Sequence, residues 1–212
     1  MTDPHANQPL ETAGAPLASA KAAVVLVHGR GADAPSILRL AEAIDVPNLA
    51  WLAPQATNNT WYPHRFIAPF AENEPYLSSA LARVDTLIGQ IQGAGIPDEH
   101  IALIGFSQGA CLASEYAARN ARRWGAIGAL SGGLIGPPGT VFEYPGSLAG
   151  TPALVGCSDV DPHIPVERVH ETTEGLRKLG AEVDERIYPG MDHTVNEDEV
   201  AWLRKTLRQL SA

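Results

Sequence analysis

The chain has 212 residues, of which 45% are hydrophobic and 18% charged, a composition typical of one globular domain with a sizeable core. Its formal net charge of −9 argues against nucleic acid and anionic membranes as partners. Two cysteines, Cys111 and Cys157, are too few for a disulfide framework and favour a reducing compartment. Neither a signal peptide nor a membrane-spanning run is recognisable, so we expect a cytoplasmic protein without stable membrane association.

The first part of the chain reads as a loose segment followed by a strand, a turn and a helix. Residues 1–20 are rich in proline, alanine and glycine, and we expect this segment to be partly mobile, with a weak edge strand within 9–17. The apolar run AAVVLV at 22–27 is typical of a strand buried on both faces of a parallel sheet. The glycine-rich turn 28–32 follows, and residues 36–44 have the spacing of an amphipathic helix.

A long segment without periodicity follows the next predicted strand, 48–52. Loops as long as 55–75 are uncommon in compact domains and are often functional. We predict that this loop forms one wall of a substrate pocket and that Trp61 contacts the substrate. The glycine- and proline-rich segment 134–150 is a candidate for a second wall. Between the two, residues 74–92 have the spacing of a long amphipathic helix.

The stretch IALIGFSQG, residues 101–109, predicts a nucleophile elbow. A short apolar strand, 101–104, leads into GFSQG, which fits G-x-S-x-G, and the small residues of 110–118 read as a helix. A strand, a tight turn with a central serine and a helix form the context in which this pentapeptide presents a nucleophile. We therefore take Ser107 as the candidate nucleophile.

The remaining chain repeats the order of strand, loop and helix. This order predicts a single α/β domain over 1–212, with a doubly wound, mainly parallel sheet and helices on both faces. In such sheets the ligand crevice lies at the carboxyl ends of the strands. The turn 28–31, Ser107, Asp161 and His193 all follow the ends of predicted strands. The later predicted strands are 124–130, 152–156 and 183–188, and the later helices follow Pro165 and Asn196.

A serine hydroxyl needs a base to take its proton, and the base needs a carboxylate to orient it. His193 follows the last predicted strand and is our candidate base. For the acid we select Asp161 over Asp159 and over Asp192, which is adjacent to the histidine. The chain order serine, aspartate, histidine is that of the α/β-hydrolase fold.

Other polar residues near the predicted crevice receive supporting roles. The backbone N–H groups of Gln108 and Arg30 are candidates for an oxyanion hole. The Arg30 side chain could meet an anionic substrate group, or it could pair with Asp33 or another carboxylate. His28 reads as a structural residue that bonds the turn, and His163 as a residue at the mouth of the site that contacts substrate.

Five stretches give the sequence a specific resemblance to the phospholipase/carboxylesterase family of α/β-hydrolases, which includes acyl-protein thioesterases and small bacterial carboxylesterases. The resemblance implies that Ser107 is the nucleophile, Asp161 the acid and His193 the base, with Arg30 and Gln108 as the oxyanion hole. The glutamine that follows the serine is typical of this group. The matching stretches are VLVHGRGA (25–32), IGFSQGA (104–110), ALSGGL (129–134), DPHIP (161–165) and YPGMDHTV (188–195).

These observations predict a serine carboxylesterase without a large cap domain that cleaves small carboxylic esters through an acyl-enzyme. The same triad would also serve a thioesterase, a lysophospholipase or a cyclic-ester hydrolase. A noncatalytic binding protein on a hydrolase scaffold is the alternative from another class. We expect no cofactor and no metal, because no metal-ligand spacing is present, and the sequence allows a homodimer without requiring one.

Overall fold

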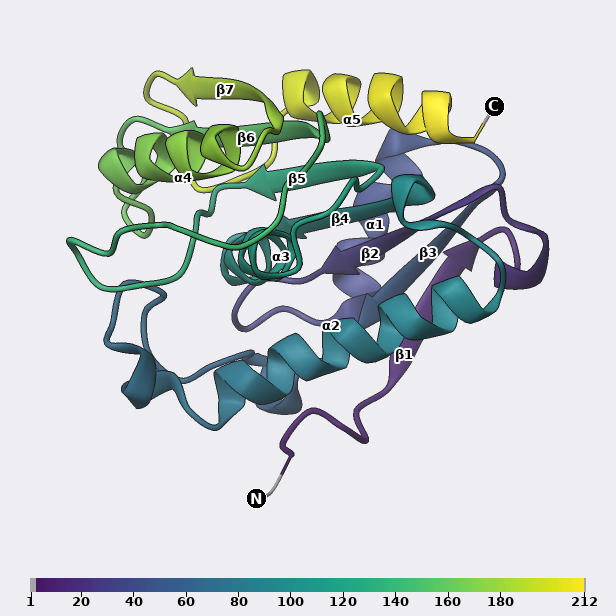
Figure 1. The fold of residues 1–212 in the computed structure, drawn as a ribbon, viewed down its shortest axis with the longest axis horizontal. Helices are drawn as coiled ribbons and strands as arrows, with labels where there is room; N and C mark the ends of the chain where they lie inside the picture. The colour runs from purple at the N-terminus through teal and green to yellow at the C-terminus, as the bar shows by residue number, and fades with distance from the viewer. Residues whose placement is uncertain (1–2, 212) are drawn as a thin grey trace.

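The computed structural model describes residues 3–211, and a seven-stranded sheet forms its centre (Figure 1). The strand order is β1-β3-β2-β4-β5-β6-β7, and every neighbouring pair except β1 and β3 is parallel. The predicted α/β-hydrolase fold class, with its doubly wound and mainly parallel sheet, is therefore confirmed. The strands are β1 (Leu10–Gly14), β2 (Ala22–Val27), β3 (Leu49–Pro54), β4 (Ile101–Phe106), β5 (Ala126–Leu130), β6 (Pro152–Ser158) and β7 (Glu182–Tyr188).

Helices cover both faces of the sheet, as the alternation of strands and helices predicts (Figure 1). Residues of α1 (Ala34–Ile44) and α5 (Glu197–Leu210) pack in one hydrophobic cluster with Ala22, Val24 and Leu26 of β2. Residues of α2 (Tyr76–Gly93), α3 (Gln108–Arg119) and α4 (Val166–Lys178) pack in the other cluster, with the alternate residues of β2. The central strands are thus buried from both sides, which explains their continuous apolar sequences.

Two helices begin at side-chain caps. The Asp33 carboxylate accepts a hydrogen bond from the Ser36 N–H at 2.9 Å, and α1 therefore begins at Ala34, two residues before the predicted start. A reciprocal capping pair begins α5, because the Asn196 side chain accepts from the Glu199 N–H and Glu199 Oε2 accepts from the Asn196 N–H. The second cap also fixes where the loop carrying His193 enters its helix.

The N-terminal segment is packed onto the domain from its first described residues. The predicted edge strand forms as β1, antiparallel to β3. Ahead of it, the buried His5 ring bonds to the carbonyl of Trp61 at 2.9 Å and accepts from the N–H of Thr57 at 3.1 Å. The segment expected to be partly mobile is therefore anchored to loop 55–75, while residues 1–2 lie outside the described residues.

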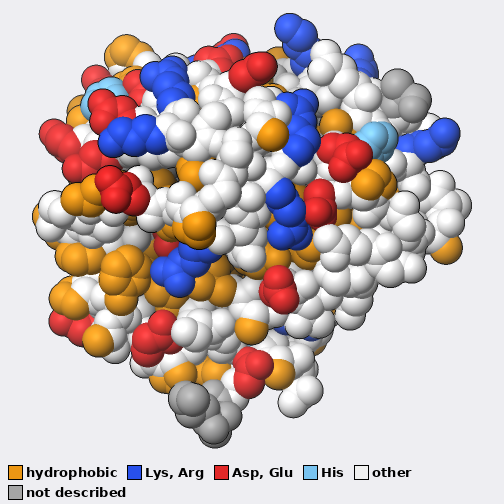
Figure 2. Space-filling view, in the orientation of Figure 1, with side chains coloured by type: hydrophobic (Ala, Val, Ile, Leu, Met, Phe, Trp, Pro, Cys, Tyr) orange, Lys and Arg blue, Asp and Glu red, His pale blue; other side chains and the backbone are white. Residues whose placement is uncertain are grey.

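The loops that follow β2, β4, β6 and β7 lie at the carboxyl edge of the sheet and carry the candidate residues. Segment 134–150 contributes instead to a separate depression of about 340 Å³ with Phe70, on a face where hydrophobic side chains gather (Figure 2).

None of the helices between residues 3 and 211 combines the length and apolar character needed to cross a membrane.

Candidate active site

Ser107 occupies a sharp turn between β4 and α3. Its backbone has φ 56° and ψ −121°, a conformation that L-residues seldom adopt. The turn is possible because Gly105 and Gly109 lack side chains: a Cβ on Gly105 would collide with the backbone of Gly109, and one on Gly109 with the carbonyl oxygen of Val27. The elbow predicted from GFSQG is therefore present, and it holds the Ser107 hydroxyl at the carboxyl edge of the sheet.

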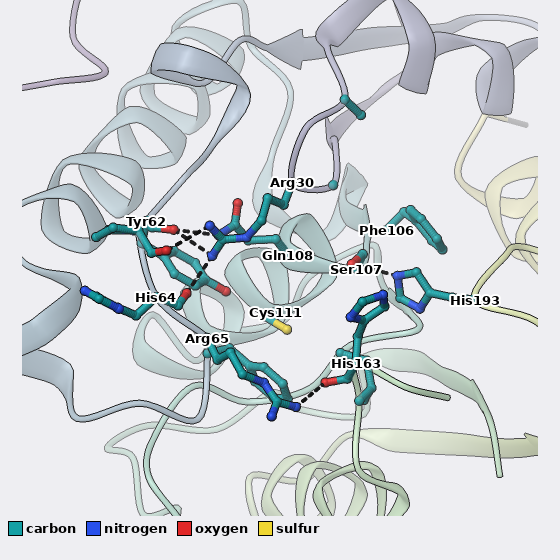
Figure 3. Close-up of a pocket in the computed structure, with 15 residues that line it drawn as sticks. Arg30, Tyr62, His64, Arg65, Phe106, Ser107, Gln108, Cys111, His163 and His193 are labelled. Atoms are coloured by element: carbon teal, nitrogen blue, oxygen red, sulfur yellow. Dashed lines mark hydrogen bonds between the residues drawn. The ribbon is translucent and has the colours of Figure 1, made fainter. Parts of the chain in front are cut away.

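The structure brings Ser107, His193 and Asp161 together in one hydrogen-bonded row. His193 Nε2 lies 2.8 Å from Ser107 Oγ (Figure 3). On the other side of the ring, His193 Nδ1 lies 2.6 Å from Asp161 Oδ2. The ring of His193 packs against those of Phe106 and His163, each with its centroid at 4.9 Å. These contacts hold the imidazole between the hydroxyl and the carboxylate.

Asp161 is placed to remain ionised. Burial alone would raise the pKa of its carboxyl group, but the bonds from His193 and from the N–H groups of His163 and Ile164 outweigh burial and lower it. Asp159 has another partner, because its Oδ1 accepts from the N–H of Gly190 at 2.8 Å. Asp192 is exposed. The geometry therefore favours Asp161 among the three aspartates considered.

Two backbone N–H groups are available beside Ser107. Gln108 is the first residue of α3, so its N–H has no partner within the helix. Among residues 3–211, neither this N–H nor that of Arg30 finds a hydrogen-bond acceptor. Both residues line the same cavity as the serine. The two candidate oxyanion donors thus lie where a bound carbonyl oxygen could meet them.

A cavity of about 510 Å³ opens at Ser107. Loop 55–75 contributes one wall, as predicted, but segment 134–150 does not line this cavity. The lining combines backbone of the first turn with aromatic, aliphatic and cationic side chains. Its residues are Gly29, Arg30, Ala32, Tyr62, Pro63, His64, Arg65, Phe66, Phe106, Ser107, Gln108, Cys111, His163, Ile164 and His193 (Figure 3).

The side chain of Gln108 ties the elbow to this wall. Its Oε1 accepts from the N–H of Trp61 at 2.9 Å, and its Nε2 donates to the carbonyl of Tyr62 at 2.8 Å. The Gln108 side chain is buried, and both bonds fix main-chain atoms of a loop segment that belongs to no helix or strand. The glutamine that marks the motif in sequence therefore positions the cavity wall relative to the nucleophile.

The expectation that Trp61 contacts substrate is wrong. The Trp61 side chain is fully buried and does not line the cavity, because it points under the loop, where its Nε1 donates to the carbonyl of His28 at 2.8 Å. Its ring packs between the rings of His5 and His28. The next residue, Tyr62, lines the cavity instead.

Arg30 does not pair with a carboxylate, so one of its two expected roles is wrong. Its guanidinium donates to three successive carbonyls of loop 55–75, those of Tyr62, Pro63 and His64, at 2.6–2.9 Å. Within residues 3–211 it has no acidic partner at ion-pair distance. Arg30 therefore braces the loop and keeps an uncompensated positive charge at the cavity.

Of the other histidines, His28 occupies a structural position, and His163 and His64 both line the cavity. His28 is buried and bonds the turn as predicted, through the carbonyl of Gly29 at 2.8 Å and the N–H of Ala56 at 3.1 Å. His163 is exposed and lines the cavity, in agreement with its predicted place at the mouth. His64 also lines the cavity, as do Arg65 and Cys111, and none of the three is among the predicted site residues. No periodic signal in an aperiodic loop could have identified His64 and Arg65.

Across residues 3–211, no three histidine, cysteine or acidic side chains converge in a way that could hold a metal ion. Cys111 and Cys157 are both free and buried. Burial raises the pKa of each thiol to about 12, so both remain protonated at neutral pH. Cys157 Sγ lies 3.6 Å from Asp161 Oδ2, beneath the acidic residue of the row.

A serine elbow at the carboxyl edge of a mainly parallel sheet, with a histidine and an aspartate arriving from later loops, defines an α/β-hydrolase. The phospholipase/carboxylesterase family model matches residues 12–211, and the chain belongs to this family. It is accordingly an ester-hydrolysing enzyme of the α/β-hydrolase superfamily.

Individual relatives agree with this assignment. The structure of a phospholipase/carboxylesterase from Dyadobacter fermentans is 44% identical, covers 95% of this chain and 96% of its own, and superposes with a TM-score of 0.91. Carboxylesterase SOBER1 of Arabidopsis thaliana is 22% identical over 91% of this chain and 94% of its own. Acyl-protein thioesterase 1 of Candida albicans is 27% identical over 91% and 93%.

Proposed function

We propose that the protein is a serine carboxylesterase in which Ser107 is the nucleophile, His193 the general base and Asp161 the acid. The observation that carries the proposal is the continuous row of hydrogen bonds from Ser107 Oγ through His193 to Asp161, at 2.8 and 2.6 Å, beside an open cavity. A hydroxyl, an imidazole and a buried carboxylate in this order suit acyl transfer.

The reaction would proceed through an acyl-enzyme. Ser107 Oγ attacks the ester carbonyl carbon while His193 Nε2 takes the hydroxyl proton, and the N–H groups of Arg30 and Gln108 donate to the resulting oxyanion. The intermediate collapses as His193 protonates the departing alcohol. Water, deprotonated by His193, then attacks the acyl group and releases the acid, with Ser107 recovering its proton. This sequence uses no cofactor or metal.

Small ester substrates fit the site. A cavity of about 510 Å³ with aromatic and aliphatic walls has room for a small ester. Free cysteines suit a reducing compartment, and we place the enzyme in the cytoplasm on this ground.

Thioester hydrolysis is the nearest alternative, because the same row of side chains would cleave a thioester and the Candida albicans relative is named as a thioesterase. Matched pairs of oxygen and sulfur esters with the same acyl group would separate the two activities. We expect the oxygen ester to be the better substrate by kcat/KM. A clear preference for the thioester would replace the carboxylesterase proposal.

The first test is the hydrolysis of p-nitrophenyl esters from acetate to palmitate by the wild-type protein and by Ser107→Ala. We expect a maximum at short acyl chains and a loss of roughly 10⁵–10⁶-fold in kcat in the variant, since the nucleophile is removed. Labelling of folded protein by a fluorophosphonate probe would report an activated Ser107 independently. Absence of both turnover and labelling in folded protein would favour the noncatalytic alternative.

A further inference from the structure

The cavity at Ser107 is lined by basic side chains and by no acidic ones. Arg30 and Arg65 line it together with three histidines, and no aspartate or glutamate does. The carboxylate of Asp161 lies behind His193 and is not part of the lining. The whole chain carries a net charge of −9, so the charge of the residues that line this cavity is opposite in sign to the net charge of the molecule. A local field of this kind selects among substrates by charge.

Arg30 is held in place by acceptors that leave its charge intact. Its three bonds go to neutral main-chain carbonyls, which orient the guanidinium without neutralising it. A guanidinium has five N–H donors, so two remain for another acceptor. The Arg30 side chain is therefore oriented before substrate arrives, which reduces the entropy lost on binding.

Arg65 approaches the cavity from another side (Figure 3). Its Nη2 donates to the carbonyl of His163 at 2.9 Å, so the side chain spans from loop 55–75 to the loop that carries Asp161. Its backbone is fixed by the buried Asn73, which donates to the Arg65 carbonyl and accepts from the N–H of His64. Among residues 3–211, no carboxylate lies at ion-pair distance from Arg65. Four of its five donors are available.

We propose that Arg30 and Arg65 form an anion subsite, and that the preferred substrates are small carboxylic esters carrying a second, negatively charged group. This inference rests on the proposed esterase function and specifies its substrate class. The shared chemistry is an oxyanion, a carboxylate or a phosphate, which guanidinium groups bind through charge-assisted hydrogen bonds. The apolar part of the substrate would lie against Tyr62, Phe66 and Ile164, which line the same cavity.

The test compares esters that differ in charge and little else. The acetate esters 4-acetoxybenzoate and 4-acetoxyphenyl phosphate carry the two anions, and 4-acetoxybenzamide is their neutral counterpart. Ethyl hydrogen adipate against ethyl hexanoate places the anion on the acyl side instead. We expect at least one anionic ester to exceed its neutral partner by about tenfold in kcat/KM, and this ratio to fall as salt is raised.

Variants assign the preference to the arginines. Arg65→Gln should reduce the anionic-to-neutral ratio by roughly tenfold, and Arg65→Lys should restore part of it. The ratio is informative because damage to Ser107, His193 or Asp161 would lower kcat/KM for the anionic and the neutral ester together. Arg39→Gln, on the exposed surface of α1, removes the same charge away from the cavity and should leave the ratio unchanged.

Two outcomes would overturn the inference while leaving the esterase intact. One is efficient hydrolysis of the neutral esters with no preference for an anion on either side, and the other is an anion preference that Arg65→Gln leaves in place. Failure of the esterase proposal would look different, because none of these esters would be cleaved and Ser107 would not be labelled by a fluorophosphonate.

Discussion

At the scale of single residues, Gln108 has two separable functions. Its backbone N–H is a candidate oxyanion donor, and its side chain fixes the main chain of Trp61 and Tyr62. The residue type matters because an amide can accept from one peptide group and donate to the next, which neither a carboxylate nor an aliphatic side chain can do. The backbone role, in contrast, is available to any residue at this position.

Replacing Gln108 with methionine should therefore destabilise the protein. The variant keeps similar bulk but leaves the buried N–H of Trp61 without its acceptor, and we expect a loss of about 1–3 kcal/mol in the free energy of unfolding. Urea denaturation followed by tryptophan fluorescence would measure it. The matched control is Gln92→Met on the exposed side of α2, expected to change stability by less than about 0.5 kcal/mol. Equal effects in the two variants would contradict the assigned role.

At the scale of elements, the elbow depends on the close approach of α3 to β2. Gly109→Ala would place a Cβ against the carbonyl oxygen of Val27. Neither β2 nor α3 can shift to relieve this contact without losing hydrogen bonds. We expect the free energy of unfolding, measured by thermal or urea denaturation, to fall by about 2–3 kcal/mol or more. Gly89→Ala on α2 has nothing within 4 Å of its added methyl group and should stabilise by about 0.5–1 kcal/mol. A tolerated Gly109→Ala would show that the contact is looser than the structure indicates.

The first turn of α5 contains a buried carboxyl group, Glu199, that makes the free energy of unfolding depend on pH. Burial raises the pKa of Glu199 to about 7, while the hydrogen bond from the Asn196 N–H opposes this shift. Its Oε1 has no partner among residues 3–211. Since the folded pKa exceeds the unfolded one, the folded state binds more protons between about pH 4.5 and pH 7, and stability falls as pH rises through that window.

Glu199→Gln should remove this dependence. Relative to wild type, its free energy of unfolding should increase from about pH 4.5 to pH 7 by on the order of 2–3 kcal/mol and then level off. Denaturation at a series of pH values would measure the difference. Glu197→Gln, exposed in the same turn, should show no comparable trend. A constant difference between wild type and Glu199→Gln across the range would exclude the buried charge as its cause.

At the scale of the whole molecule, most of the architecture could be predicted because it follows from periodicity. Apolar runs identified the parallel strands, and the elbow, together with the loops after the last two strands, placed Ser107, Asp161 and His193 at one edge. The loop walls could not be predicted in the same way. Trp61 points inward and Tyr62 lines the cavity because of bonds to His28 and Gln108, partners more than 30 residues away.

The N-terminal segment shows the same limit. Its composition indicated mobility, yet His5 is buried against loop 55–75 through bonds that span more than 50 residues. A polar residue in a segment without periodicity gives no sign of such a partner. Composition reports average behaviour, whereas one histidine with two main-chain partners holds the segment against the loop in this structure.

That anchor has a consequence for the enzyme after synthesis. A protease that clips the chain just before Pro9 would leave the sheet and the row from Ser107 to Asp161 in place, because β1 begins only at Leu10. It would nevertheless remove the support beneath the cavity wall at Thr57 and Trp61. A preparation nicked in this way would still react with a fluorophosphonate, yet it would choose among esters differently from the intact protein. The integrity of the amino terminus would thus be read out as substrate selectivity.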